Sequence, residues 1–346
     1  MTHTAPETFS AAVVEKFGPT LTLKDLDVPR PGRHQALVKV IASGICHTDL
    51  HAAEGDWPVK PEPPFVPGHE GIGEVVELGP GDHSVAVGDV VGNAWLWSTC
   101  GECEFCRTGR ETQCHEAEYG GYTQNGSFGQ YMLVDTRYAA RIPDSVTDYA
   151  EAAPVLCAGV TVYKALKVSE TRPGQFMVIS GVGGLGHMAV QYAVAMGMRV
   201  IAVDIAEDKL ELAKKHGAEF TVNARESDPV ERVQDITGGG SHGIVVTAVH
   251  QDAFGQALGM ARRDGTVVFV GLPAGDFPAS VFDIVFNNLT IRGSLVGTRQ
   301  DMVEALDFYA RGLVTPSVKT CALEDVNDVF EAMRHGKIDG RVSIKY

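Results

Sequence analysis

The chain has 346 residues, which is long for one hydrophobic core and favours two domains. An apolar fraction of 44% and a charged fraction of 21% are typical of a soluble globular protein. The formal charge of −15, from 29 Lys and Arg against 44 Asp and Glu, disfavours a nucleic-acid partner or an anionic membrane surface.

Short β-branched runs, broken by Gly, Pro and Asp, fill the chain to about residue 150. They are QALVKVIASGI (35–45), GIGEVVELG (71–79), VAVGDVVG (85–92) and FGQYMLV (128–134). This spacing predicts an irregular β domain with a barrel-like core. Neither a secretory signal pattern nor an apolar run of about 18 residues occurs, so we expect a cytoplasmic protein without a membrane partner.

A short segment holds four of the seven cysteines, Cys100, Cys103, Cys106 and Cys114, in C-x2-C-x2-C-x7-C spacing. So dense a group favours a metal site over a disulfide framework. Four thiolates can surround one Zn²⁺ and leave no open position, which predicts a structural role. An iron–sulfur cluster is the alternative occupant.

The middle of the chain alternates between strand-like and helical patterns. In order these are QFMVIS (175–180), HMAVQYAVAMG (187–197), RVIAVDI (199–205), AEDKLELAKKHGA (206–218), GIVVTAV (243–249), DAFGQALGMA (252–261) and GTVVFVG (265–271). The alternation predicts an α/β fold with a doubly wound parallel sheet. The tail has one helical pattern, at 298–312, and the short elements VNDVFEAMRHG (326–336) and GRVSIKY (340–346) follow it.

The segment GVGGLG follows one predicted strand and opens a predicted helix. In this context Gly181 would form a tight turn and Gly183 would let the backbone approach a pyrophosphate. Gly186 would allow close packing of helix and strand, with Gly184 and Leu185 in the same loop. The helix N-terminus favours the phosphate charge, so we predict a dinucleotide site.

Asp204 ends the next predicted strand, at the distance expected for a residue that binds the adenosine ribose. A carboxylate there would accept hydrogen bonds from both ribose hydroxyls and repel a 2′-phosphate. We therefore expect NAD in preference to NADP, with Lys209 close enough to reach the same ribose. A glycine turn followed by a surface acid is the alternative interpretation.

Three further potential ligands are scattered along the chain: Cys46 in SGICHTDLH, His69 in PGHE and Cys157 in VLCAG. A lone Cys or His is more often a buried structural residue. Cys46 and His69 each follow a β-rich run and lie beside the acids Asp49 and Glu70, which could orient a ligand. Spacing alone does not establish a site here.

The chain resembles the zinc-dependent medium-chain alcohol dehydrogenases over nearly its whole length, most closely the short, yeast-like and bacterial forms. The matching stretches are GICHTDLH, PGHEGIGEV, CGECEFCRTGRETQC, GVGGLG with Asp204, and GRVSIKY. The resemblance implies a GroES-like catalytic domain at 1–156, with its structural zinc loop at about 97–116. It also implies a Rossmann NAD-binding domain at 157–296, a return to the catalytic domain at 297–346, and a homo-oligomer, expected to be a tetramer.

By position, the resemblance implies a catalytic zinc ion held by Cys46, His69 and Cys157, which is the ligand set known for alcohol dehydrogenase. With the four-Cys site, this makes two zinc ions per chain. Glu70 would be a nearby or transient ligand, and Asp49 would orient His69.

The resemblance also implies roles in cofactor binding for residues without a motif of their own. His47 and Arg341 would lie beside the pyrophosphate. Val270, Ser294 and Val296 would hold the nicotinamide through backbone groups.

The expected chemistry needs a path for a proton. An open zinc position lowers the pKa of a bound alcohol, which then gives hydride to the nicotinamide. The proton has to leave a buried site, so a hydroxyl-to-imidazole path is required. The resemblance assigns this path to Thr48, which would contact the substrate oxygen, and His51, which would pass the proton to water.

We therefore expect reversible oxidation of small primary alcohols to aldehydes. Trp57 and Trp95 favour small substrates because two indoles near the zinc would narrow the pocket, although packing in the core is the alternative for each. A related polyol, threonine or aromatic-alcohol dehydrogenase is the alternative enzyme. A non-catalytic NAD-binding protein would lack a ligand or a relay residue, and none is missing here.

Overall fold

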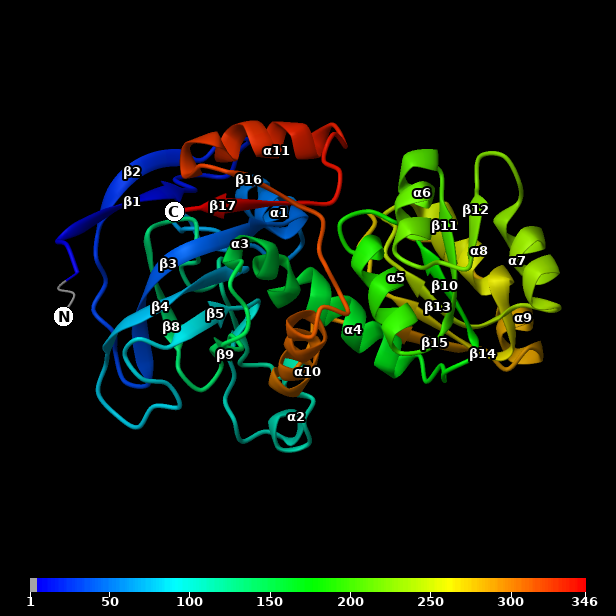
Figure 1. Cartoon of the computed structure of the whole chain (residues 1–346), viewed down its shortest axis with the longest axis horizontal. Helices are drawn as coiled ribbons and strands as arrows, with labels where there is room; N and C mark the ends of the chain where they lie inside the picture. Colours follow the sequence, from blue (N-terminus) through cyan, green and yellow to red (C-terminus); the bar gives the residue numbers. More distant parts are fainter. Residues whose placement is uncertain (1–4) are drawn as a thin grey trace. The chain divides into compact units, whose positions relative to one another are not determined.

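The computed structural model describes residues 5–346, which form two compact units (Figure 1). The first unit comprises the chain up to Cys157 together with Gly297–Ala310 and Pro316–Tyr346. The second comprises Ala158–Val296 and Arg311–Thr315. Within residues 5–346, no helix has the length and apolar character that crossing a membrane requires.

The first unit is built on a seven-stranded sheet. Its strands are β3 (Gln35–Ile45), β4 (Gly71–Leu78), β5 (Val90–Asn93), β8 (Tyr131–Asp135), β9 (Ala140–Arg141), β16 (Val318–Cys321) and β17 (Arg341–Lys345). The order is β16-β17-β3-β4-β5-β9, and β8 also pairs with β3. Because β17 pairs antiparallel with β3, the end of the chain completes a sheet that the first part begins.

Two small sheets complete the strands of this unit. They pair β1 (Thr8–Val13) with β2 (Thr22–Asp27), and β6 (Leu96–Ser98) with β7 (Glu118–Tyr119). The predicted strand at 85–92 is only half right, because a turn precedes β5. In that turn the Asp89 N–H donates to the Ala86 carbonyl at 3.1 Å, and the Asp89 carboxylate accepts from the Ala86 N–H at 2.9 Å.

Helices connect these strands, although the sequence predicted mainly β structure before residue 150. They are α1 (His47–Glu54), α2 (Glu104–Arg107), η1 (Glu111–Gln113), α3 (Tyr149–Ala152), η2 (Ala153–Leu156), α10 (Arg299–Ala310), η3 (Leu323–Asp325) and α11 (Val326–Arg334). The helix α1 matters most for function, because it begins directly after β3 and carries the residues of the motif CHTDLH.

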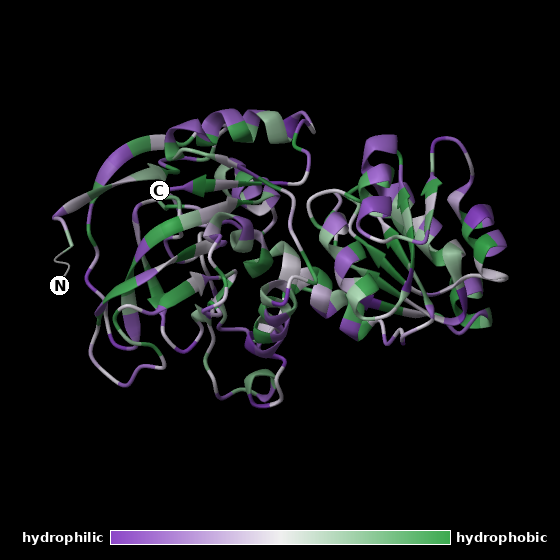
Figure 2. Ribbon diagram, viewed as in Figure 1, coloured by the Kyte–Doolittle hydropathy of each residue, from purple (hydrophilic) through white to green (hydrophobic). Residues whose placement is uncertain are grey.

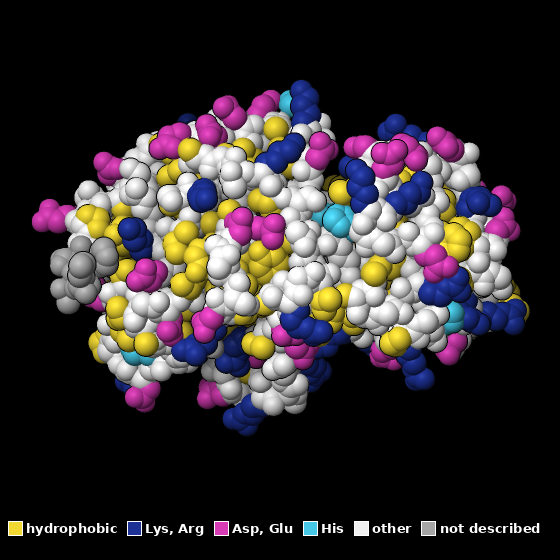
Figure 3. Space-filling model, viewed as in Figure 1, with side chains coloured by type: hydrophobic (Ala, Val, Ile, Leu, Met, Phe, Trp, Pro, Cys, Tyr) yellow, Lys and Arg dark blue, Asp and Glu magenta, His cyan; other side chains and the backbone are white. Residues whose placement is uncertain are grey.

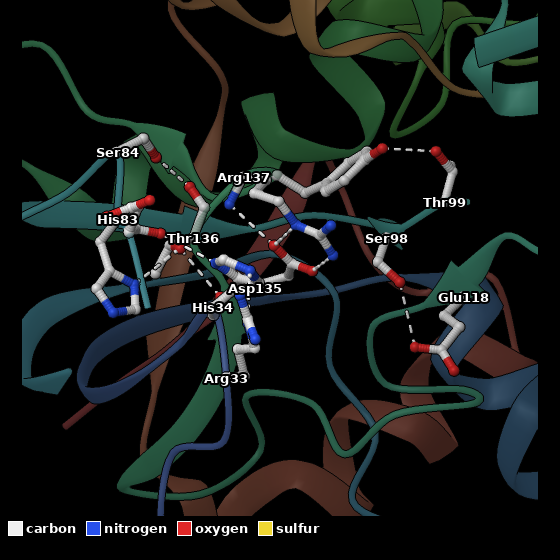
Figure 4. A network of polar contacts seen from close by, with 12 residues as sticks. Arg33, His34, His83, Ser84, Ser98, Thr99, Glu118, Asp135, Thr136 and Arg137 are labelled. Carbon is white, nitrogen blue, oxygen red and sulfur yellow. Dashed lines mark hydrogen bonds and ion pairs between the residues drawn. The ribbon is translucent and has the colours of Figure 1, made fainter. Parts of the chain in front are cut away.

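Polar contacts join three loops around β3 and β8 (Figure 4). The Thr136 hydroxyl donates to the His34 carbonyl at 3.0 Å and lies 3.1 Å from His83 Nδ1. The Ser84 hydroxyl donates to the Thr136 carbonyl. These contacts fix the ends of the sheet while its apolar interior forms the core.

The second unit contains a six-stranded parallel sheet. Its strands are β10 (Phe176–Ser180), β11 (Arg199–Asp204), β12 (Phe220–Asn223), β13 (Ser241–Val246), β14 (Ala261–Phe269) and β15 (Thr290–Gly293). Its helices are α4 (Ala158–Val168), α5 (Gly186–Ala195), α6 (Glu207–Lys215), α7 (Pro229–Thr237), α8 (Gln251–Met260) and α9 (Val281–Phe286). The strand order β12-β11-β10-β13-β14-β15 is that of a doubly wound Rossmann sheet.

The hydropathy of the strands and helices explains this architecture. The central strands β10, β11 and β13 each contain a buried hydrophobic run, whereas the helices that flank them have a polar side (Figure 2). Strands buried on both faces are expected in a parallel sheet. On the face drawn in Figure 3, acidic and basic side chains lie interspersed over both units.

Candidate functional site

Four side chains able to bind a metal meet inside the first unit: Cys46, His69, Glu70 and Cys157. All four are buried, and their ligand atoms lie within 4.8 Å of one another. The Nε2 atom of His69 is 3.2 Å from the sulfur of Cys157. We call this group the buried cluster.

Local structure explains how the buried cluster assembles. Cys46 follows β3 and is the N-cap of α1, while His69 and Glu70 directly precede β4. Since β3 and β4 pair antiparallel, the end of one lies beside the start of the other. Cys157 follows the short helix η2. Gly44 makes room, because a Cβ atom there would lie 1.9 Å from Glu70 Oε2.

Asp49 on α1 connects two members of the buried cluster. Its Oδ1 accepts hydrogen bonds from His69 Nδ1 at 2.9 Å and from the Gly68 N–H at 3.1 Å, and its Oδ2 accepts from the Cys46 N–H at 2.9 Å. A carboxylate only accepts, so Nδ1 of His69 carries a proton and Nε2 is the atom left to bind a metal. The contact that the predicted role of Asp49 requires is therefore present.

Glu70 forms a buried ion pair with Arg341 of β17. Within the described residues, Glu70 Oε2 and Arg341 Nε have no hydrogen-bond partner. Burial raises the pKa of Glu70 to about 7, against the opposing effect of the Arg341 charge. One carboxylate oxygen thus remains available, while the predicted contact of Arg341 with a pyrophosphate stays a prediction.

The thiols and the imidazole of the buried cluster hold protons unequally. A hydrogen bond from Cys157 lowers the pKa of Cys46 despite burial, and the same bond, with burial, raises the pKa of Cys157. Burial disfavours a charged His69, but the charge and hydrogen bond of Asp49 outweigh it and raise the pKa of His69. Since thiolate and neutral imidazole are the binding forms, metal binding here would release protons.

The four-Cys loop forms a second cluster in the first unit. The sulfurs of Cys100, Cys103, Cys106 and Cys114 lie within 4.8 Å of one another. Backbone N–H groups of Glu102 and Cys103 lower the pKa of Cys100 to about 7, whereas burial raises the pKa of Cys114 to about 11. Four sulfurs at this separation can surround one metal ion.

Contacts with α10 anchor the four-Cys loop. The buried Glu111 carboxylate accepts from the Arg299 N–H at 2.8 Å and from its guanidinium at 3.0 Å. The guanidinium also lies 4.4 Å from the ring centre of Tyr138, whose hydroxyl is 2.5 Å from Thr99 Oγ1. That oxygen is 3.1 Å from the sulfur of Cys106, so the cluster is tied to a helix from the distant tail.

The predicted relay residues lie on α1. Thr48 Oγ1 is 3.7 Å from the sulfur of Cys46, so the hydroxyl reaches the buried cluster. His51 is half-buried, and its Nδ1 is 2.9 Å from Asp56 Oδ2. Its ring stacks on Trp57 with 5.2 Å between the centres.

Aromatic rings surround this region. Trp95 is buried, and its ring centre is 5.3 Å from that of His69. Tyr122 connects the two predicted pocket residues, at 5.2 Å from Trp95 and 6.4 Å from Trp57, and Tyr119 stacks on Trp95 at 5.0 Å. Sequence reasoning missed both tyrosines, because a Gly-rich turn has no periodicity that indicates which side chains face inward.

The glycine loop lies in the second unit, between β10 and α5. Gly181 has φ of 92°, and a Cβ atom there would lie 2.7 Å from Ala248 N. A Cβ on Gly186 would lie 1.8 Å from the Gly181 carbonyl oxygen, so this position requires close packing. A Cβ on Gly183 would meet nothing within 4 Å, which leaves open space where a ligand could approach the backbone.

Asp204 at the end of β11 contacts the same loop. Its Oδ2 accepts from the Val182 N–H at 2.7 Å, and its Oδ1 accepts from the N–H groups of Ile205 at 2.7 Å and Ala206 at 3.1 Å. These contacts fix the carboxylate, and its remaining lone pairs can accept from ribose hydroxyls. Lys209 lies half-buried in the first turn of α6.

The residues predicted to hold the nicotinamide follow β14 and β15. The Val270 N–H donates to the Val246 carbonyl and the Ser294 N–H to the Phe269 carbonyl, both at 3.0 Å. Because these N–H groups are engaged, the predicted contacts of Val270 and Ser294 with a nicotinamide would use their carbonyl oxygens. Val296 has φ of 40°, which is unusual for a β-branched residue.

Three predicted cofactor residues lie at helix starts. His47 is exposed at the start of α1 in the first unit, and Gly184 and Leu185 immediately precede α5 in the second. The predicted approach of His47 to a pyrophosphate held by the second unit stays a prediction.

Each of the two units contains a region that matches a known protein family. Residues 32–144 match the family model described as an alcohol dehydrogenase GroES-like domain, and residues 184–311 match the zinc-binding dehydrogenase family. An alcohol dehydrogenase of Moraxella sp. (strain TAE123) is 57% identical over 336 residues, which cover 97% of this chain and 99% of the relative.

Solved structures share the fold, and two of them serve as examples. The alcohol dehydrogenase of the archaeon Aeropyrum pernix is 32% identical, with a TM-score of 0.90 over 97% of this chain and 100% of the other. The acetophenone reductase of Geotrichum candidum, solved in complex with NAD, is 31% identical, with a TM-score of 0.87 over 99% of this chain and 98% of the other.

The chain belongs to the zinc-dependent medium-chain alcohol dehydrogenase family. The family, the α/β fold class with a GroES-like part, and the enzymatic class predicted from the sequence are confirmed.

Proposed function

We propose that this enzyme oxidises small primary alcohols to aldehydes, reversibly, and transfers the hydride to NAD. The observation that carries the proposal is the buried cluster, in which two thiols and one imidazole converge with a carboxylate. We assign the first unit as the catalytic domain and the second as the NAD-binding domain.

The donor set of the buried cluster fits a catalytic zinc ion. Cys46, His69 and Cys157 supply the softer ligands that zinc prefers, and Asp49 leaves His69 Nε2 available. The unpaired Glu70 oxygen fits a nearby or transient ligand. Zinc, when bound, would supply the Lewis acidity that lowers the pKa of an alcohol. The four-Cys loop would hold a second, structural zinc ion.

The chain itself would move the proton. Thr48 lies against Cys46, so its hydroxyl can accept the alcohol proton while passing its own onward. His51 is half-buried on the same helix, where its imidazole can take that proton and release it to water.

NAD use is supported by the glycine loop and Asp204. The space over Gly183 suits a pyrophosphate, and the fixed carboxylate of Asp204 suits a free 2′-hydroxyl better than a 2′-phosphate. The NAD complex of the acetophenone reductase agrees with this proposal.

The aromatic rings favour small substrates. Trp95 packs against His69, and Tyr122 joins it to Trp57, so bulky groups near the buried cluster would meet rigid rings. A polyol, threonine or aromatic-alcohol dehydrogenase would need a wider or more polar space there.

We propose a homo-oligomer, with a tetramer as the expected form, in a reducing cytoplasmic compartment. The helix α9 directly precedes the edge strand β15 in the chain, and its Val281, Phe282, Val285 and Phe286 are 61–73% exposed. An apolar surface beside an unpaired strand edge suits contact with a second copy. The seven free cysteines suit a compartment in which thiols stay reduced.

One experiment tests the main proposal. Metal analysis should find two zinc ions per chain. In assays with ethanol, butanol, 2-propanol, benzyl alcohol and sorbitol, NADH formation should be fastest with ethanol and butanol. Sorbitol or benzyl alcohol ahead of ethanol would favour the alternative enzymes. Light scattering on the same sample measures the number of chains in the oligomer. The variant Phe282→Ser should form a smaller oligomer.

A further inference from the structure

A carboxylate that sequence reasoning did not single out contacts the proposed proton acceptor. His51 Nδ1 lies 2.9 Å from Asp56 Oδ2 and 3.1 Å from Asp56 Oδ1. The His51 side chain is 33% exposed and that of Asp56 is 46% exposed. The pair therefore lies where a proton can pass to water.

The backbone on both sides of Asp56 is fixed. Gly55 ends α1 in the left-handed region with φ of 65°, and its N–H donates to the His51 carbonyl at 2.8 Å. A Cβ atom at Gly55 would lie 2.6 Å from an aromatic ring, so neither the turn nor the space admits another residue. Further on, the Tyr122 hydroxyl donates to the Val59 carbonyl. The position of Asp56 thus follows from anchored neighbours.

The hydrogen bond determines which nitrogen of His51 can act as a base. A carboxylate accepts and does not donate, so Nδ1 carries the proton of the neutral ring. The lone pair is then on Nε2, and only this atom can take up a proton. Stacking on Trp57, with 24° between the planes, restricts rotation of the ring.

Two other polar side chains interact with the pair, one from α1 and one from a remote loop. His47 lies one helical turn before His51 on α1. Tyr122 faces the pair from the loop after β7: burial and, secondarily, the charge of Asp56 raise the pKa of its hydroxyl. Its neutral hydroxyl is engaged with Val59, so Asp56 is the anionic group that contacts the ring of His51.

We propose that Asp56 is a positioning residue that holds His51 in the tautomer able to accept the alcohol proton; this rests on the proposed relay. The alcohol O–H bond breaks, its electron pair stays on oxygen, and Thr48 takes that proton while giving its own to His51 Nε2. A new N–H bond forms there, and the ring then releases a proton to water. The hydride leaves the carbinol carbon for NAD.

Asp56→Asn tests the proposal, because the amide can donate to Nδ1 as well as accept from it and so no longer fixes the tautomer. We expect kcat for ethanol oxidation to fall about tenfold, less than the roughly 10²–10⁴-fold contribution of a general base itself. The KM for ethanol should stay within about twofold, because substrate binding is not involved. The solvent deuterium isotope effect on kcat should rise, and added imidazole should restore part of the rate.

Three further variants keep the test decisive. Glu62→Gln removes an exposed charge from the same segment and should leave kcat unchanged. Asp56→Glu keeps a carboxylate and should recover part of the rate. In a His51→Gln background, Asp56→Asn should have no further effect, since its role is exercised through His51.

The positioning role would be overturned if Asp56→Asn lowered kcat by the same factor in the wild type and in the His51→Gln background. It would also be overturned if Asp56→Asn kept the wild-type kcat. If the wild type formed no NADH from any alcohol, the proposed function would fail instead. The two failures are therefore distinguishable in one set of assays. Thermal melting of Asp56→Asn should match the wild type, as its side chain is exposed.

Discussion

The two cysteine clusters of the first unit use similar ligand atoms but are assembled in opposite ways. The four-Cys loop takes all its ligands from residues 100–114, and three of its four cysteines are only half-buried. The buried cluster takes ligands from three distant segments, and each is at most 8% exposed. A local site can form as its loop closes, whereas the distant one requires the completed sheet. We therefore expect the first to contribute mainly to stability and the second to catalysis.

The largest expected effect follows from Cys46→Ala. Removing one of three protein ligands from the proposed catalytic zinc should lower ethanol oxidation by at least about 10³-fold, since the Lewis acid supplies several kcal/mol to the transition state. Steady-state NADH formation measures the loss. Cys321→Ala, outside both clusters, is the matched control and should keep its activity. Retention of a tenth of the rate by Cys46→Ala would remove this residue from the catalytic centre.

Cys103→Ala should mainly affect stability. A closed four-thiolate site contributes folding free energy directly, so its disruption should lower the melting temperature by about 5 °C or more. Calorimetry and metal analysis check this, with loss of one zinc ion from each chain. Cys46→Ala should shift melting less. Unchanged melting with both metals retained would show that this loop is not a structural metal site.

Asp49→Asn should weaken the buried cluster without removing a ligand. The amide can accept only part of the hydrogen bonds now made to His69 and Cys46, so metal affinity should fall about 10–100-fold. Competition with a chelator measures the affinity. Asp27→Asn, an exposed acid of the same unit, is the control. Equal metal retention by both variants would mean that Asp49 serves the fold alone.

The smallest expected effect tests the second unit, whose ribose site is again local in sequence. Asp204→Ala should narrow the NAD-over-NADP ratio of kcat/KM by about tenfold, or about 1.4 kcal/mol, through lost charge repulsion and ribose hydrogen bonds. Parallel assays with the two cofactors give the ratio. Asp208→Ala, which changes an exposed acid on α6, should leave it unchanged. If both variants behaved alike, Asp204 would have no part in cofactor choice.

The sequence predicted those elements whose residues form a clear hydrophobic pattern, and it missed those without one. The strand β3 matches the predicted run at 35–45, because its long β-branched segment is bounded by polar residues. The helix α1 was not predicted, because it is short and buries Asp49 beside Leu50, Ala52 and Ala53. A buried acid breaks the apolar periodicity on which helix prediction depends. The same acid turns out to organise the buried cluster.

The sequence by itself determined those features whose residues are neighbours along the chain. Four cysteines within residues 100–114 and the glycine loop at 181–186 are close in space because few bonds separate them. The alternation of strands and helices after residue 175 likewise follows from local periodicity. These patterns predicted the four-Cys loop, the dinucleotide loop and the parallel sheet, while the resemblance supplied the expected roles of scattered residues.

Only the tertiary structure decided which distant side chains meet. Pairing of β3 with β4 brings Cys46 beside His69, and pairing of β17 with β3 brings Arg341 to Glu70. The contact of Asp56 with His51 likewise depends on a left-handed turn at Gly55 and an anchor from a remote tyrosine. Such contacts depend on strand register and loop closure, which involve the whole fold and leave no periodic mark on the chain.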